Sequence, residues 1–220
     1  FFIYHAAAAD PEIQALSSMG GELRYLSVSE QKLYAAVGGN LQIYDISGGE
    51  LDLLQSVNLG NVLETWIIDD NKIYGITTED QFFIYDISNI QSITALNSGL
   101  DLPEGAYSYK IVKNGQYIYI TYAVLAQTAS GGYTNQYYLY ILSAVSPNNP
   151  AFVKQVELDY SVRDLAAGNN YLYLIENYKL HSYSLNQPSN PQLTNSLSFN
   201  GQGNRLTVSG NQGILSHGSV

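Results

Sequence analysis

The stretch Phe82-Phe83-Ile84-Tyr85-Asp86-Ile87-Ser88 returns in similar form as Leu41-Gln42-Ile43-Tyr44-Asp45-Ile46-Ser47. Weaker copies occupy residues 138–143 and 180–185, and the chain opens with the related sequence Phe1-Phe2-Ile3-Tyr4. The tyrosines that these copies share are 40, 41, 55 and 43 residues apart; they are Tyr4, Tyr44, Tyr85, Tyr140 and Tyr183. A period of about forty residues indicates an architecture with one small structural unit per repeat.

Each repeat contains four short apolar segments. Lys32-Leu33-Tyr34 precedes one tyrosine segment, and its counterparts are residues 72–74, 117–119, 171–173 and 213–215. Another apolar segment comes before each of these, and a polar turn and a fourth segment follow the tyrosine segment. Helical periodicity is nowhere sustained, so the segments are interpreted as strands. Four short antiparallel strands in about forty residues describe one blade of a β-propeller.

The two ends of the chain complement each other. Residues 205–220 supply the first two strands of a blade, and residues 1–18 supply a third and a fourth. Counting from Tyr183 through the C-terminus to Tyr4 gives 41 residues, which matches the period. We therefore predict an all-β fold, a five-bladed β-propeller of four-stranded antiparallel blades with the last blade shared between the N- and C-termini. The alternative is a fragment of a larger propeller, for which this spacing would be a coincidence.

The predicted blades cover residues 19–57, 58–98, 101–157 and 158–198, and the last combines 200–220 with 1–18. A chain of 220 residues suits this single domain. Because the first residue is Phe rather than Met, we expect a mature or trimmed chain.

Composition narrows the classes of partner. Nineteen acidic and nine basic residues give a net charge of −10, which argues against nucleic acid or an anionic membrane surface as the main partner. No apolar run is long enough to insert into a membrane. The chain has no cysteine, and its three histidines fall on different predicted strands without metal-ligand spacing. We therefore expect no metal site and no cofactor.

Five equivalent positions are candidates for binding. They lie nine residues before an equivalent apolar residue of the second strand, near the start of the innermost strand, and are Arg24, Glu64, Tyr109, Arg163 and Arg205. Side chains there can line the mouth of a propeller's central channel. One hypothesis is a mouth whose arginines hold a carboxylate, phosphate or acidic sugar through paired hydrogen bonds. The other is that these arginines bond to carbonyls and carboxylates of neighbouring blades and brace the ring.

The 55-residue spacing before Tyr140 exceeds the period by about fourteen residues. The excess lies between the second and third strands of its repeat and predicts one protruding hairpin, on the same face as the starts of the innermost strands. A long polar loop in such a place can recognise a ligand. Its candidate contact residues are Gln127, Ser130, Tyr133 and Asn135. A tolerated, flexible insertion is the other interpretation.

The repeat resembles that of bacterial and archaeal cell-surface propellers built from LVIVD repeats. The resemblance rests on the two Ile-Tyr-Asp-Ile-Ser copies, the proline-containing turns at 146–150 and 188–191, and Gly168-Asn169-Asn170-Tyr171-Leu172-Tyr173-Leu174. It implies a secreted or cell-surface binding or scaffold module without catalytic residues, whose partner is a protein or glycan of the cell envelope or extracellular matrix.

A glycan-active enzyme that uses the channel of a glycosidase-like five-bladed propeller is the alternative function. Such an enzyme needs two or more converging carboxylates. Only Glu64 holds a predicted mouth position, and Asp164, one residue out of phase, is expected to point towards a blade interface. The sequence therefore favours a non-catalytic module.

Overall fold

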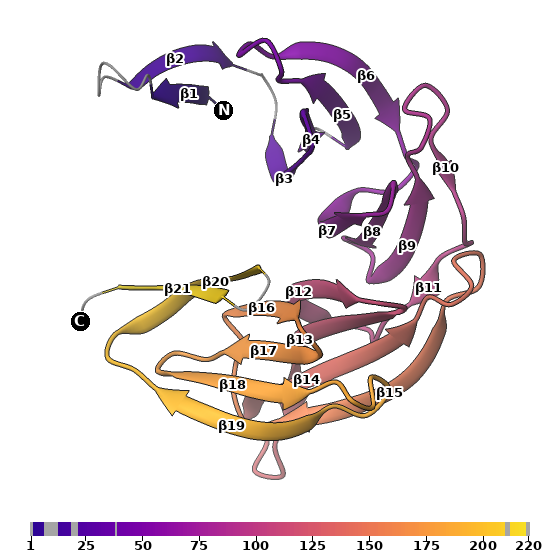
Figure 1. Cartoon of the computed structure of the whole chain (residues 1–220). Coiled ribbons are helices and arrows are strands. Elements are labelled where there is room, and N and C mark those ends of the chain that lie inside the picture. The colour runs from indigo at the N-terminus through magenta and orange to yellow at the C-terminus, as the bar shows by residue number, and fades with distance from the viewer. Residues whose placement is uncertain (1, 7–12, 19–21, 38, 210–211, 219–220) are drawn as a thin grey trace. The chain divides into compact units, whose positions relative to one another are not determined.

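The computed structural model describes residues 2–6, 13–18, 22–37, 39–209 and 212–218, and every regular element in them is a β-strand (Figure 1). The chain forms two compact units, residues 1–100 and residues 101–220. These are called the N-terminal unit and the C-terminal unit below. The described residues contain no helix long and apolar enough to cross a membrane.

The N-terminal unit contains one antiparallel strand pair and two larger antiparallel sheets. The pair consists of β1 (Phe2–Ala6) and β2 (Ile13–Ser18). The first sheet has the order β3 (Leu23–Ser29), β4 (Lys32–Val37), β5 (Asn40–Asp45) and β6 (Asp52–Asn58). The second has the order β7 (Leu63–Asp69), β8 (Lys72–Thr77), β9 (Gln81–Asp86) and β10 (Thr94–Ala95), and β11 (Leu100–Asp101) also pairs with β9.

The C-terminal unit repeats the pattern. One sheet has the order β12 (Ala106–Asn114), β13 (Tyr117–Gln127), β14 (Tyr133–Ser143) and β15 (Ala151–Leu158). The next has the order β16 (Asp164–Gly168), β17 (Tyr171–Ile175), β18 (Lys179–Ser184) and β19 (Gln192–Ser198). The last two strands, β20 (Gln202–Ser209) and β21 (Gln212–Gly218), form an antiparallel pair. The end segments are thus two-stranded pairs as predicted, and their union in one blade stays a prediction.

Two-residue turns join the first and second strands of each sheet. Asp69 pairs with Lys72, and the turn residues Asp70 and Asn71 have φ values of 48° and 54°. Asn and Asp tolerate this left-handed conformation, which suits the twist of a tight hairpin. The sequence Asp69-Asp70-Asn71 thus forms the tight turn between β7 and β8.

The Asp-Ile-Ser copies end the third strands. Asp45 Oδ1 accepts a hydrogen bond from the backbone N–H of Ser47 at 2.7 Å, and Asp86 Oδ1 accepts one from Ser88 at 2.8 Å. Hydrogen bonds from the hydroxyl and the backbone N–H of Ser47 hold the pKa of the Asp45 carboxyl below its usual value. The motif therefore shapes the turn after the strand.

Strand pairing corrects the predicted register in the third repeat. Tyr44 pairs with Leu33, and Tyr85 and Tyr183 pair with the equivalent residues of their own sheets. In the β12–β15 sheet that position belongs to Leu142, not to Tyr140. The corrected spacings from Tyr44 to Tyr183 are 41, 57 and 41 residues. The position requires a large buried side chain, which Leu142 provides as well as a tyrosine does.

The sheets pack face to face through their innermost strands. β3 contacts β7, and in the C-terminal unit β12 contacts β16 and β16 contacts β20. Trp66 is fully buried and donates its indole N–H to the Ser27 hydroxyl of the neighbouring sheet at 2.7 Å. In the C-terminal unit, Leu139 and Leu172 belong to one apolar core between adjacent sheets. Four-stranded sheets packed in this way are the blades of a β-propeller.

Candidate functional site

Two of the predicted mouth positions, Arg24 and Glu64, coincide with β-bulges in the innermost strands. Leu23 pairs with Val37 and Tyr25 with Ala36, so Arg24 is an extra residue, and Glu64 is the extra residue of the same bulge in β7. A bulge re-aims the side chains beside it. The Arg24 guanidinium forms an ion pair with Glu22, 3.2 Å away, rather than with a neighbouring sheet.

Tyr109, another predicted mouth residue, has a buried side chain. It is 4% exposed and packs against Tyr122, with ring centroids 6.2 Å apart. The bulge in β12 contains both Ser108 and Tyr109, and Ser108 is the exposed residue of the two. Because two bulge residues face one partner residue, the large side chain takes the buried place and the small one the exposed place.

Arg205 is out of register by one residue, which corrects the prediction that it is equivalent to Arg24 and Glu64. Val208 pairs with Gly213 as Val28 pairs with Leu33, so Gly213 is the true equivalent of Leu33. The bulge residue of β20 is therefore Asn204. Counting the positions of β20 back from its two-residue turn, rather than from an apolar residue of β21, would have identified Asn204. The arrangement of all five positions around one channel mouth stays a prediction.

Arg163 directly precedes β16. Its backbone N–H donates to the Ile175 carbonyl at 2.7 Å, and its Nε donates to Asn177 Oδ1 at 2.8 Å. Arg163 is exposed, and no carboxylate among the described residues forms an ion pair with it. The terminal nitrogens of its guanidinium therefore remain available to an anionic ligand.

The predicted protruding hairpin is present, and it is an ordered strand pair. β12 stops pairing with β13 at Val124, and β15 pairs with β14 only from Tyr137 onwards. Beyond these points β13 and β14 pair with each other alone, as far as Gln127 and Tyr133. At the tip, Thr128 N–H donates to the Gly132 carbonyl at 2.8 Å. The extra residues of this repeat have mainly lengthened β13 and β14 rather than made a loose loop.

Three of the four candidate loop residues share one face of this hairpin. Leu125 pairs with Asn135 and Gln127 with Tyr133, and alternate residues of a strand point to the same side. We call these four residues the ribbon face; all four are exposed, Leu125 by 58% and Tyr133 by 68%. Ser130 is not part of it, because it lies in the turn, with its hydroxyl 3.1 Å from that of Thr128.

The ribbon face looks towards the side of the β16–β19 sheet. Following the same alternation down the strands leads to Ala123 and Tyr137, which pair with each other. These two line a small cavity together with Ser161 and Val162, which directly precede Arg163. The ribbon face is thus the outward extension of the face that packs on the next sheet. Arg163, Asn177 and the half-exposed Tyr178 lie at the corresponding end of that sheet.

Backbone hydrogen bonds fix the end of the β16–β19 sheet at which Arg163 lies. The carbonyl of Asn177 accepts the backbone N–H of Gly203 at 2.9 Å, and the carbonyl of Tyr178 accepts that of Phe199 at 3.0 Å. These bonds connect the β17–β18 turn to the segment that leads into β20. A ligand at Arg163 would therefore meet a preformed surface, which lowers the entropic cost of binding.

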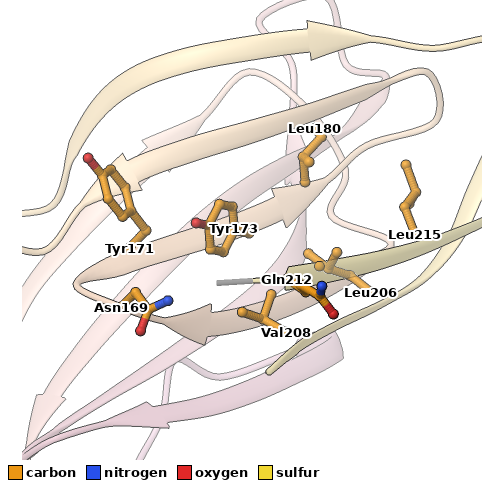
Figure 2. Close-up of a pocket in the computed structure, with 9 residues that line it drawn as sticks. Asn169, Tyr171, Tyr173, Leu180, Leu206, Val208, Gln212 and Leu215 are labelled. Carbon is orange, nitrogen blue, oxygen red and sulfur yellow. The ribbon is translucent and has the colours of Figure 1, made fainter. Parts of the chain in front are cut away.

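An apolar groove of about 460 Å³ lies between the β16–β19 sheet and the β20–β21 pair (Figure 2). Tyr171 and Tyr173 of β17 face Leu206 and Val208 of β20 across it, and Leu215 of β21 closes one end. None of the residues that line the groove is charged. The groove therefore suits large apolar side chains better than a charged ligand.

Solved structures similar to this chain include two WD40 domains and one designed protein. The WD40 domain of Pan2 from Neurospora crassa is 14% identical to this chain, with a TM-score of 0.59. The matched region covers 96% of this chain and 65% of the Pan2 domain. The WD40 domain of Toxoplasma gondii coronin is 11% identical, with a TM-score of 0.62, and the match covers 90% of this chain and 51% of the coronin domain. The computationally designed Ika8 protein is 11% identical, with a TM-score of 0.53, and the match covers 93% of this chain and 71% of Ika8.

WD40 domains are propellers with four strands per blade, so the likeness confirms the predicted all-β propeller fold. At identities this low it shows the fold alone. This chain spans about two thirds of the Pan2 domain and about half of the coronin domain. No family model and no curated protein matches the sequence.

Proposed function

We propose that this chain is a non-catalytic binding module that holds its partner between the ribbon face and Arg163. The observation that carries the proposal is the projecting β13–β14 hairpin. Leu125 and Tyr133 are diagonal neighbours on one face of it, and both are largely exposed. Diagonal cross-strand neighbours lie within reach of each other when their side chains are this large, so the two present apolar surface on the same face. The other ribbon positions, Gln127 and Asn135, add amide groups that donate and accept hydrogen bonds.

The chemistry of the site indicates the class of partner. A tyrosine ring offers a flat surface for a sugar ring or an aliphatic side chain. Arg163 offers a planar fork that fits a carboxylate or phosphate. The partner is thus a protein or glycan segment with an anionic group, from the cell envelope or extracellular matrix. The resemblance to LVIVD-repeat surface propellers supports an extracellular or cell-surface location.

The role of Asp164 supports binding rather than glycan cleavage. Its Oδ2 accepts the backbone N–H of Leu206 at 2.7 Å, and its Oδ1 accepts that of Leu165 at 3.0 Å. A general acid must be free to exchange a proton with its substrate. A carboxylate with both oxygens engaged in backbone hydrogen bonds serves the fold instead.

An array of acidic and neutral glycans and cell-envelope fragments tests the proposal. The wild type should bind a subset of the acidic probes, more weakly at higher salt concentration because the contact with Arg163 is ionic. Arg163→Ala and Tyr133→Ala should each raise the Kd by about tenfold or more, as expected for a buried contact at the centre of an interface.

Two surface variants are matched controls. Lys154→Ala removes one positive charge from the outer strand β15, and Phe152→Ala removes an aromatic ring that is 51% exposed on the same strand. Neither should change binding. Unchanged affinity in folded Arg163→Ala and Tyr133→Ala proteins, or an equal loss in the controls, would overturn the proposal.

A further inference from the structure

A polar cavity of about 560 Å³ lies within the N-terminal unit, between the β3–β6 sheet and the β7–β10 sheet. The β3–β4 turn, the β7–β8 turn and the loop that follows β9 all contribute to its lining. Ile68, Ile87 and Ile90 supply its apolar side, and they pack in the core that joins these two sheets. An apolar wall with a few polar groups around it is typical of a small-molecule site.

Tyr34 presents a buried hydroxyl to this cavity. The residue is 5% exposed and belongs to the core between the two sheets. No residue in the described part of the chain forms a hydrogen bond with its hydroxyl. Burial, and after it the charge of Glu30, raises the pKa of Tyr34, so the Glu30 carboxylate lies close to this hydroxyl. A buried hydroxyl without a protein partner calls for a ligand or a water that completes its bonding.

The equivalent tyrosine of the C-terminal unit has a protein partner. Tyr119 occupies in β13 the position that Tyr34 has in β4. Its hydroxyl donates to the Pro188 carbonyl, in the loop that follows β18 of the next sheet, at 2.9 Å. The corresponding residue of the loop after β9 is Ile90, which lines the cavity. The same junction between sheets is thus closed by a hydrogen bond in one unit and leaves a cavity in the other.

The polar groups around the cavity suit a ligand without net charge. They carry both charge signs together with an amide and a hydroxyl, and are Ser29, Glu30, Lys32, Asp69, Asp70 and Asn71. Lys32 lies 3.9 Å from the Glu30 carboxylate, and Lys72 lies 3.4 Å from that of Asp70, so lysines of the protein already neutralise part of the negative charge. Carboxylates accept hydrogen bonds, ammonium groups donate them, and amides and hydroxyls do both.

We propose that this cavity binds a neutral saccharide ring, whose hydroxyl groups bond to the Tyr34 hydroxyl and the Glu30 carboxylate. The C–H face of the ring lies against the isoleucine side of the cavity, and the amide of Asn71 bonds to a further hydroxyl. This site lies within the N-terminal unit and is separate from the one proposed at Arg163. The inference therefore does not depend on the proposed function.

Titration with the methyl glycosides of glucose, galactose, mannose and N-acetylglucosamine, followed by NMR and calorimetry, tests the proposal. At least one of them should bind saturably to the wild type. Tyr34→Phe removes only the hydroxyl and should raise the Kd about three- to tenfold, as expected for one lost hydrogen bond. Glu30→Gln should raise it about tenfold or more, because the bonds to a carboxylate are stronger.

The equivalent tyrosine is the matched control. Tyr119→Phe loses the bond to Pro188, so it should lower the urea midpoint but leave the Kd for the glycoside unchanged. Tyr34→Phe should show the reverse pattern. Glu79→Gln removes one negative charge at the opposite ends of the strands and should leave the Kd unchanged. Arg163→Ala should also have no effect, so the two proposed sites succeed or fail separately.

Three results would overturn the proposal. One is that the folded wild type binds none of the four glycosides. Another is that a glycoside binds equally well to the wild type, Tyr34→Phe and Glu30→Gln. The third is that the amide of Nα-acetyl-lysine binds more tightly than every glycoside and displaces it, which would make the cavity a site for an ammonium group.

Discussion

The Asp164 carboxylate accepts the backbone N–H of Leu206 at 2.7 Å and thereby joins two adjacent innermost strands, β16 and β20. Its other oxygen accepts the N–H of Leu165 in its own strand. One side chain thus satisfies two backbone donors at the junction of two sheets. It therefore adds to the backbone hydrogen bonds that Asn177 and Tyr178 accept in fixing how these two sheets meet.

Asp164→Asn should lower the free energy of unfolding by about 1–3 kcal/mol, since one carbonyl oxygen cannot replace two acceptors and a donor near the sheet junction is left unpaired. Urea unfolding followed by circular dichroism measures the loss. Glu157→Gln, on the exposed outer strand β15, is the control and should be neutral. An Asp164→Asn protein as stable as the control would show that this bond is not needed.

Gly203→Ala should destabilise the C-terminal unit. A Cβ atom at this position would lie 2.4 Å from Ile175 Cγ2 and 3.2 Å from the Glu176 carbonyl oxygen. Overpacking of this kind typically costs about 1–3 kcal/mol. Gly48→Ala is the control, because nothing lies within 4 Å of its added Cβ.

A double-mutant cycle separates this clash from a backbone effect. Ile175→Leu removes the branch at Cβ, so it should be less harmful in the Gly203→Ala background than in the wild type. Additive losses in unfolding free energy would contradict steric overlap with Ile175 as the cause.

Acidification should destabilise the protein through His181. The ring is buried and stacks on Tyr160 at 4.2 Å, and burial lowers its pKa despite Glu176 Oε1, 3.6 Å from Nε2. The unfolded chain, with a histidine pKa of about 6.5, therefore binds the proton more readily than the folded chain. The contribution of neutral His181 to the free energy of unfolding is complete at pH values above the pKa of the unfolded chain. It is lost as the pH falls through the lower pKa of the folded state.

Urea unfolding at a series of pH values from about 8 to about 5.5 measures this effect, because ordinary carboxylates titrate lower. The wild type should lose stability across the series, and His181→Gln should lose less over the same interval. Identical slopes in the two proteins would exclude His181 as the source.

Strand order and turns could be predicted from the sequence because they follow from local patterns. The repeated set of four antiparallel strands is confirmed. The Asp-Ile-Ser copies end the third strands, and Asp70 and Asn71 form a turn. These depend on hydrophobic alternation and on residues that favour left-handed turns, which a single sequence displays directly.

The register of the innermost strands could not be predicted in the same way. β21 has Gly213 at the position that apolar residues hold in the other second strands, so counting nine residues from Ile214 selected Arg205 in place of Asn204. The ribbon face could not be predicted either, because the sequence alone does not show which residues of the hairpin pair with each other. Only the pairing of Gln127 with Tyr133 shows that these two residues share a side with Leu125 and Asn135.

Hydrogen exchange of the β21 backbone amides tests most directly the central prediction from the sequence, which is that the two ends of this chain share one blade. Alternate residues of a strand direct their N–H groups to opposite neighbours, so pairing with β20 alone protects only one alternate set in residues 213–216. The account predicts that both sets exchange as slowly as those of the central strand β17, and that deletion of residues 1–18 exposes one set. Rapid exchange of one set in the intact chain, unchanged by the deletion, would contradict it.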